Sequence, residues 1–279
     1  MKKLTAWGIG VMTLALFECE GQRVGSFPYE ERPISLKDAY GLFGDRIVEE
    51  AGSMGESKDN EWWVNSGGYF FAEGGIGRTI QGELSPTNRW FKAYARANPL
   101  DTDGGSHPQN IFRLLTKKKM ANSVTEACFK INSYYKSKSP NRDSHNGFLF
   151  FGRYKDGDTT YYSGLRVDGN AVVKKKLNGV YYTLVEKKIF PGTFNRETSP
   201  NLLPTGKWMG LRVIVRNDER GSARIAVFLD RENNGKWSKE IDVFDEGDFG
   251  ERPIQGKGYG GIRTDFMDVE FQRHLLIGN

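Results

Sequence analysis

Tyrosine and basic side chains recur at alternate positions of several extended segments. Successive side chains of a strand point to opposite faces, so Tyr162 and Arg166 in segment 160–168 share one face. Tyr181 and Thr183 share a face of another segment. An arginine can bind a carboxylate through two parallel hydrogen bonds, and a tyrosine can exchange a proton. This combination fits β-elimination in a uronic-acid polymer, where a cation neutralises the carboxylate while a tyrosine takes the neighbouring proton.

The candidate site residues come from the polar faces of predicted strands. The catalytic candidates are Tyr162, Tyr181 and Arg166. The candidates for substrate binding are Arg113, Lys130, Asn132, Arg153, Lys174, Lys176 and Arg263. The alternative interpretation is that these side chains are ordinary charges on a sheet that faces solvent.

Two acidic turns raise the question of a metal ion. Segment 230–235 alternates oxygen-bearing side chains before a glycine, as a calcium loop does, but its twelfth position is Ile241 rather than a carboxylate. Asp101 and Asp103 precede two glycines. Because Asp and Asn favour turns by themselves, we expect turn chemistry at both places. The sequence requires no cofactor, and a structural calcium ion is the only metal that it suggests.

The N-terminus has the pattern of a secretory signal. Lys2 and Lys3 precede the apolar stretch 4–17, which is too short to span a bilayer, since about 20 helical residues are needed. Cleavage after Gly21 is expected, so 1–21 is predicted to be a signal peptide. The mature protein should therefore be secreted or periplasmic.

The overall charge is mildly basic. The chain has 40 Lys and Arg against 35 Asp and Glu, a formal net charge of +5, and this excess favours anionic partners. The basic runs 117–119 and 174–176 also suit nucleic acid, which needs stacking aromatic side chains as well. The export signal argues against nucleic acid, and neighbouring lysines of one strand that point to opposite faces are the simpler explanation.

Most of the chain has the signals of β-structure. Alternating segments are separated by turn residues such as Asn178-Gly179, which are typical of hairpins. The predicted strands are 62–72, 76–84, 89–96, 109–116, 124–134, 147–155, 160–168, 170–177, 180–187, 207–217, 222–231, 236–245 and 258–272. Many antiparallel strands without a linker indicate one all-β domain, 61–279, folded as a sandwich or barrel.

The segment between the signal and this domain, 22–60, is predicted to be an N-terminal extension. Within it, Leu36, Tyr40 and Ile47 have helical spacing. We therefore expect one short peripheral helix in 35–52, although two glycines weaken it.

Four stretches resemble a known family. They are WWVNSGG (62–68), DTDGGSHPQNIFRLLT (101–116), YYSGLRVDGNAVVKKKLNGVYYTL (161–184) and GYGGIRTDFMDVEF (258–271). Together they resemble secreted bacterial proteins of the concanavalin A-like lectin/glucanase superfamily, which is related to laminin G-like domains and jelly-roll polysaccharide lyases. The resemblance implies a two-sheet antiparallel jelly-roll sandwich whose concave sheet face holds a glycan. Because the superfamily includes lectins, hydrolases and lyases, it does not decide the activity.

The sequence departs from the enzyme patterns of this superfamily. The Gln-Ile-His of alginate lyases is absent, so a lyase would depend on tyrosine. Segment 240–245 resembles the Glu-x-Asp-x-x-Glu signature of laminarinase-like glycosidases, whose catalytic carboxylates lie about 5–5.5 Å apart. Asp245 is shorter than the expected glutamate, and the segment follows a tight turn, which favours a hairpin with exposed acids.

Three functions are left open. The first is a lyase that cleaves an anionic, uronic-acid-containing polysaccharide by β-elimination, which the lack of a second domain favours. The alternative is a non-catalytic carbohydrate-binding or lectin-like protein. A further alternative is a retaining glycoside hydrolase that uses Glu240, Asp242 and Asp245. In each case we expect a monomer that binds a polysaccharide, and neither nucleic acid nor, once the signal is removed, a membrane.

Overall fold

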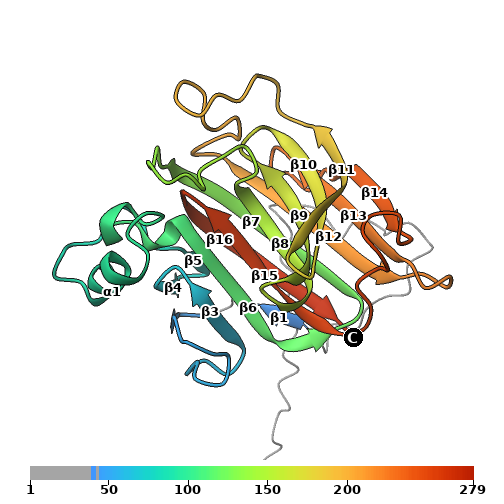
Figure 1. Ribbon diagram of the computed structural model, residues 1–279, viewed down its shortest axis with the longest axis horizontal. Helices are drawn as coiled ribbons and strands as arrows, with labels where there is room; N and C mark the ends of the chain where they lie inside the picture. The colour runs from blue at the N-terminus through green and yellow to red at the C-terminus, as the bar shows by residue number, and fades with distance from the viewer. Residues whose placement is uncertain (1–38, 42–43) are drawn as a thin grey trace, which may run out of the picture.

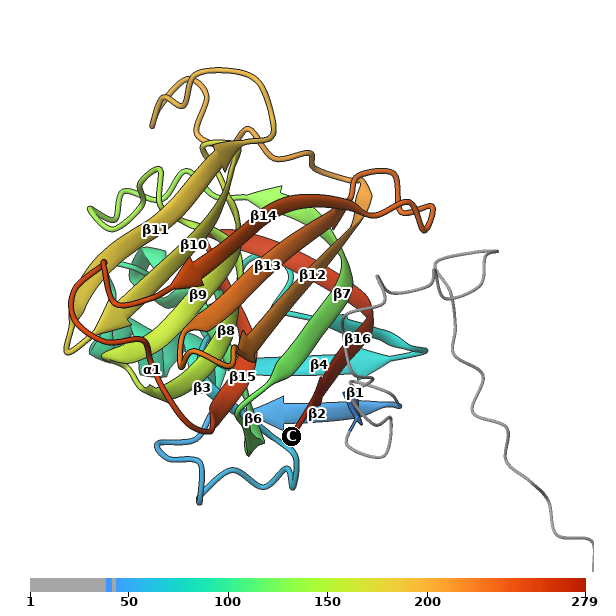
Figure 2. The same ribbon diagram turned by 90° about the vertical axis from the view of Figure 1, so that its right-hand side faces the viewer.

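Two antiparallel β-sheets lie face to face in the computed structural model, which describes residues 39–41 and 44–279 (Figures 1 and 2). The all-β, two-sheet sandwich predicted from the sequence is therefore confirmed. The predicted signal peptide lies outside the described residues. Within the described ranges, no helix is both long and apolar enough to cross a bilayer.

The larger sheet has nine strands. Eight follow one another in the order β14 (Ser238–Asp245), β13 (Ala223–Asp230), β12 (Trp208–Asn217), β7 (Ser123–Tyr134), β16 (Met267–Gly278), β5 (Ile76–Arg78), β4 (Tyr69–Glu73) and β2 (Arg46–Glu49). The ninth, β1 (Ala39–Gly41), pairs with β16. Part of the predicted N-terminal extension thus joins this sheet.

The smaller sheet has seven strands and positions the candidate site. Their order is β11 (Val180–Lys188), β10 (Asn170–Leu177), β9 (Thr159–Arg166), β8 (Gly147–Asp156), β15 (Gly258–Asp265), β6 (Ile111–Met120) and β3 (Trp62–Ser66). Between β10 and β11, Asn178 and Gly179 have φ angles of 51° and 84°, as a tight hairpin turn requires. The predicted hairpin at this dipeptide is therefore confirmed.

Helical structure occurs where a strand was predicted. Residues Arg89–Ala97 form α1, whose N-terminus is capped by Asn88, since its side chain accepts a hydrogen bond from the Trp90 N–H. The predicted strand 89–96 is therefore wrong, and so is the helix predicted in 35–52, which contains β1 and β2. Two short 3₁₀ turns follow α1, namely η2 (Asp103–Gly105) and η3 (Pro108–Asn110).

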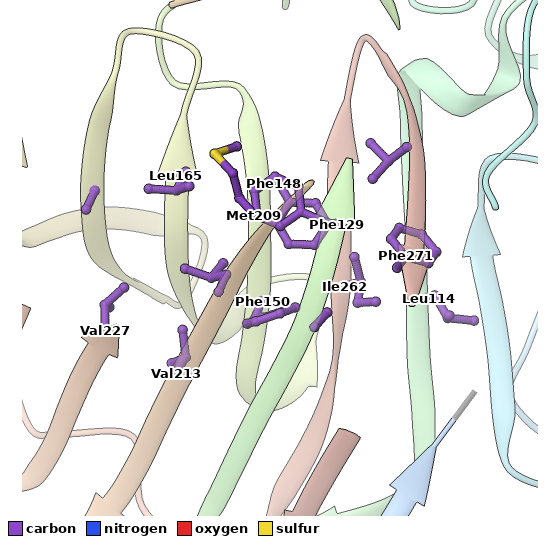
Figure 3. Packing of buried hydrophobic residues seen from close by; sticks show 14 of the residues in the cluster. Leu114, Phe129, Phe148, Phe150, Leu165, Met209, Val213, Val227, Ile262 and Phe271 are labelled. Carbon is purple, nitrogen blue, oxygen red and sulfur yellow. The ribbon is translucent and has the colours of Figure 1, made fainter. Parts of the chain in front are cut away.

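The main core fills the space between the sheets (Figure 3). Phe129 of the larger sheet stacks on Phe148 of the smaller one, with ring centroids 4.0 Å apart. The run 148–151 is buried throughout: Phe148 and Phe150 belong to this core, and Leu149 and Phe151 to a second cluster. Strand β8 is therefore buried on both faces, so the outer face of the smaller sheet has its own apolar layer.

Candidate functional site

Most of the predicted site residues meet on the outer face of the seven-stranded sheet, called the outer face below. Strand register places Lys174 opposite Tyr162 and Arg263 opposite Arg113. The alternate residues of these strands belong to the main core, so the polar ones point outward. The predicted residues on the outer face are Arg113, Tyr162, Arg166, Lys174, Lys176, Tyr181 and Arg263.

An apolar layer lies beneath these side chains. It consists of Trp63, Leu115, Leu149, Phe151, Tyr154, Tyr162 and Val172. The sequence analysis did not identify this layer. The continuous apolar run 148–151 was the available signal, since a strand that is buried on both faces lacks alternation.

Two guanidinium groups on neighbouring strands form the most basic part of the outer face. The Nε atom of Arg263 donates to both carboxylate oxygens of Asp265, at 2.9 and 3.0 Å. Arg113 donates instead to the neutral hydroxyl of Ser66, at 3.1 Å, and makes no ion pair with a carboxylate of the described residues. Asp265 is therefore the only carboxylate of the described residues that pairs with either of these two arginines. Ser66 is a site residue that the sequence analysis did not identify.

The pKa values of the two arginines reflect this imbalance. Burial, and then the nearby positive charge of Arg263, lowers the pKa of Arg113. Burial acts in the same direction on Arg263, but the charge and hydrogen bonds of Asp265 overcome it and raise the pKa of Arg263. Of these two arginines, Arg113 is thus the one whose charge the surrounding protein compensates less.

Two tyrosines adjoin the arginine pair. The rings of Tyr162 and Tyr181 are 6.0 Å apart, and the guanidinium of Arg263 lies 5.2 Å from the centre of the Tyr162 ring. Tyr162 is buried, whereas Tyr181 is 51% exposed. Burial, opposed by the charge of Arg263, raises the pKa of Tyr162 to about 12. Its hydroxyl therefore keeps its proton at neutral pH and can donate a hydrogen bond.

The other basic residues of the outer face differ in how far their charges are matched. Arg166 forms ion pairs with Asp168 and Glu186, and Lys176 pairs with Asp158 at 2.9 Å. Lys174 makes no ion pair within the part of the chain that the structure describes. Burial, and then the charge of Arg166, lowers the pKa of Lys174. Lys174 therefore resembles Arg113 in having no direct carboxylate partner.

Lys130 and Asn132 do not lie on the outer face. Both belong to β7 of the nine-stranded sheet, between residues of the main core. The Lys130 ammonium pairs with Glu270 at 2.6 Å, and the Asn132 amide donates to Gln81 at 2.8 Å. Their assignment to the same substrate site is therefore wrong, because the two sheets present their polar faces on opposite sides of the sandwich.

Arg153 is an internal side chain rather than a substrate contact. The strand register shifts between Gly152 and Asp156, and Arg153 has a φ of 50° at this irregularity. Its side chain is buried and donates to the carbonyls of Ala121 and Ile254 and to the Asn217 side chain. These bonds occupy the guanidinium, so the prediction that Arg153 binds substrate is wrong.

The three carboxylates of the glycosidase alternative do not form one site. Glu240 pairs with Lys187 at 2.8 Å, and hydrogen bonds from Arg224 help lower the pKa of Asp242 to about 2. Asp245 is fully buried between the sheets and pairs with Lys175. Asp242 lies on the opposite side of β14 from Asp245, and Glu240, at a register shift in β14, also pairs with Arg231. The three carboxylates therefore do not face one site, and the structure contradicts this alternative.

No group of three or more His, Cys, Asp or Glu side chains is placed to hold a metal ion within 39–41 and 44–279. Asp230 accepts hydrogen bonds from the backbone of Asn234 and Gly235, as a turn aspartate does. Asp101 and Asp103 accept hydrogen bonds from side chains of the 137–141 segment. Protein donors therefore occupy the oxygens that were considered for calcium.

Comparison with known proteins gives structural likenesses only. No protein-family model matches the chain, and no curated protein matches it. The carbohydrate-binding module CBM66 from Bacillus subtilis is 11% identical, with a TM-score of 0.47 over 78% of this chain and 95% of that one. The Ca²⁺-bound exoplasmic/lumenal domain of VIP36 is 11% identical, with a TM-score of 0.45 over 88% and 92%. The Emp46p carbohydrate recognition domain is 11% identical, with a TM-score of 0.40 over 80% and 94%.

Proposed function

We propose that this chain is an exported carbohydrate-binding protein that holds an anionic, uronic-acid-containing polysaccharide on the outer face. The observation that carries the proposal is Arg113, a partly buried guanidinium that lies beside Arg263 and makes no ion pair with a described carboxylate. Removing a charge from water is costly unless a partner compensates it. A ligand carboxylate would supply that partner, and a guanidinium binds this group through two parallel hydrogen bonds.

The aromatic residues suit the rest of a sugar ring. Tyr181 is half exposed next to buried Tyr162, and the Lys176 ammonium lies 5.0 Å from the Tyr181 ring centre. A tyrosine offers an apolar ring face together with a hydroxyl that can form a hydrogen bond. Lys174, between Tyr162 and Thr183 in the sheet, adds a second cation that makes no ion pair with a described carboxylate. The outer face can therefore contact both the apolar and the charged parts of a sugar acid.

Arg113→Gln is expected to weaken polysaccharide binding about 10–100-fold, because a hydrogen bond to a charged group contributes about 1.5–3 kcal/mol. Tyr181→Ala should also weaken binding, through loss of the exposed ring. Binding by the wild-type protein should fall as the salt concentration rises, since salt screens exposed charges. Affinity gel electrophoresis with alginate, pectate, glucuronan and a neutral glucan measures these effects.

The matched control is Asn132→Ala, which truncates an exposed polar residue of the other sheet. It should leave the retardation of every polymer unchanged. Equal retardation of the wild type and Arg113→Gln would contradict the proposed site. The melting temperatures of Arg113→Gln and Asn132→Ala, compared with that of the wild type, show that both variants are folded. Equal retardation by the neutral glucan and the acidic polymers would contradict the proposal that the ligand is anionic.

A lyase that uses the same outer face is the second candidate, because Tyr162, Tyr181 and Arg263 converge there. We expect binding without cleavage, because burial raises the pKa of Tyr162 to about 12 and so disfavours the phenolate that would take the proton. Absorbance of unsaturated uronides, measured during incubation with the same acidic polymers, should therefore stay flat. A rising signal that Tyr162→Phe abolishes would establish the lyase instead.

A further inference from the structure

A surface cavity of about 470 Å³ lies between the α1–β6 connection and the residues that follow β7. Its lining includes Pro99, Leu100, His107, Tyr135, Lys136 and Lys138. This volume falls within the range of about 300–1,000 Å³ that small-molecule sites occupy. None of these residues belongs to the arginine and tyrosine cluster of the outer face. The α1 helix beside the cavity lies outside the two sheet layers (Figure 1).

Two rings in close contact form part of the cavity wall, and hydrogen bonds to carboxylates hold both of them in place. The imidazole of His107 and the ring of Tyr135 have centroids 4.1 Å apart. The Tyr135 hydroxyl donates to Asp268 at 2.5 Å. The Nδ1 atom of His107 lies 3.0 Å from a carboxylate oxygen of Asp103, which fixes the orientation of the imidazole. The rings are thus preorganised.

The cavity combines apolar walls with positive charge. Leu100 is 60% exposed and presents an apolar side chain to the cavity. Lys136 and Lys138 are exposed at the rim. The one acid in the lining, Asp103, already accepts hydrogen bonds from Ser137 and Asn110 and contacts His107. The lining therefore has two lysines against one acid, and outside the lining Glu83 lies 3.9 Å from the Nε2 atom of His107. The net charge of the lining is positive.

We infer that this cavity is a second binding site, for a single sugar ring that bears a carboxylate. The rings of His107 and Tyr135, together with Leu100, would contact the apolar face of the sugar ring, and the two lysines would attract its negative charge. That the ring is a sugar rests on the proposed function. The location of the site does not, because the cavity and the outer face use different residues.

The test uses D-glucuronate as the probe and the imidazole signals of His107 as the reporter, in the full mature protein. Millimolar glucuronate should shift the His107 signals in a saturable way, and neutral glucose should bind at least several-fold more weakly. Leu100→Trp, which fills the cavity from an exposed position, should reduce the affinity at least tenfold. Lys138→Glu should reduce it at least threefold. The charge control Lys92→Glu, on an exposed residue of α1 outside the lining, should leave it unchanged.

Unshifted His107 signals at saturating glucuronate would overturn the inference, and so would full affinity in Leu100→Trp. Equal affinity for glucose and glucuronate would overturn the inference that the ligand carries a carboxylate. Arg113→Gln separates the two proposals, because it should weaken polysaccharide retention on the outer face and leave the His107 response intact. If glucuronate shifts the His107 signals but the wild type retains no polymer, only the proposed function fails. If the wild type retains the acidic polymers but glucuronate leaves the His107 signals unshifted, only the cavity site is overturned.

Discussion

Asp245→Asn is expected to lower the free energy of unfolding by about 3–5 kcal/mol, because it leaves a fully buried ammonium without its counter-ion. Lys175 and Asp245 are both inaccessible to solvent, and the Lys175 Nζ atom lies 2.9 Å from Asp245 Oδ2. The same oxygen accepts a 2.6 Å hydrogen bond from Tyr161. Asparagine keeps the size of the side chain and can still bind Tyr161, so the change isolates the charge. Urea unfolding at pH 7 measures the effect.

Two comparisons show whether the loss comes from an unpaired charge. The double variant Lys175→Met/Asp245→Leu removes both ions and should recover most of the lost stability, since apolar replacement of a buried pair is often neutral. Lys207→Met breaks the exposed Lys207–Glu232 pair and should cost at most about 1 kcal/mol. A cost for Asp245→Asn no larger than that of Lys207→Met would contradict the explanation.

This ion pair also connects the core to the outer face. Lys175 comes from β10, whose neighbouring lysines carry part of the candidate site, and Asp245 ends β14 of the other sheet. Tyr161, which binds Asp245, adjoins Tyr162 in β9 and accepts a hydrogen bond from the Ile254 backbone. The buried network thus fixes two strands whose opposite sides present Tyr162, Lys174 and Lys176.

Alternation along single strands could be predicted from the sequence. The run 174–176 was expected to point its lysines to opposite faces, and Lys175 is buried while Lys174 and Lys176 point outward. Tyr162 and Arg263 were likewise placed on the polar faces of their strands, and their contact shows that both lie on the same face of the sheet. These predictions succeeded because the two-residue period of a strand is a local property of the backbone.

The assignment of strands to sheets could not be predicted from the same pattern. Lys130 and Asn132 have the outward parity that was expected, but β7 lies in the other sheet, and sheet membership depends on long-range pairing. Arg153 was misplaced because an irregularity in β8 interrupts the alternation. The helix α1 was missed because its aromatic residues also favour strands, whereas its Asn88 cap was not recognised.

Lowering the pH from 7 to 3 is expected to remove as much as about 5 kcal/mol of stability through His274 alone. Its imidazole is buried next to Trp62 and Phe150, and neither ring nitrogen has a hydrogen-bond partner among the described residues. Burial lowers the pKa of His274 to about 3, against 6.5 for an ordinary histidine. Between these values the unfolded chain binds a proton that the folded chain does not. Stability is therefore complete above pH 6.5, falls as the pH decreases, and loses nothing further through this group below about 3.

His274→Leu should flatten this part of the profile and cost little at pH 7, because an apolar side chain of similar size replaces an imidazole with two unsatisfied nitrogens. The measurement is the free energy of unfolding in urea at intervals from pH 7 to pH 3, with variant and wild type compared at each pH. The comparison removes the contribution of acids such as Asp242, which both proteins share. His145→Leu, at an exposed histidine, should keep the steep wild-type profile, because His274 is still present. Parallel profiles for His274→Leu and the wild type would show that the buried imidazole does not control the response to acid.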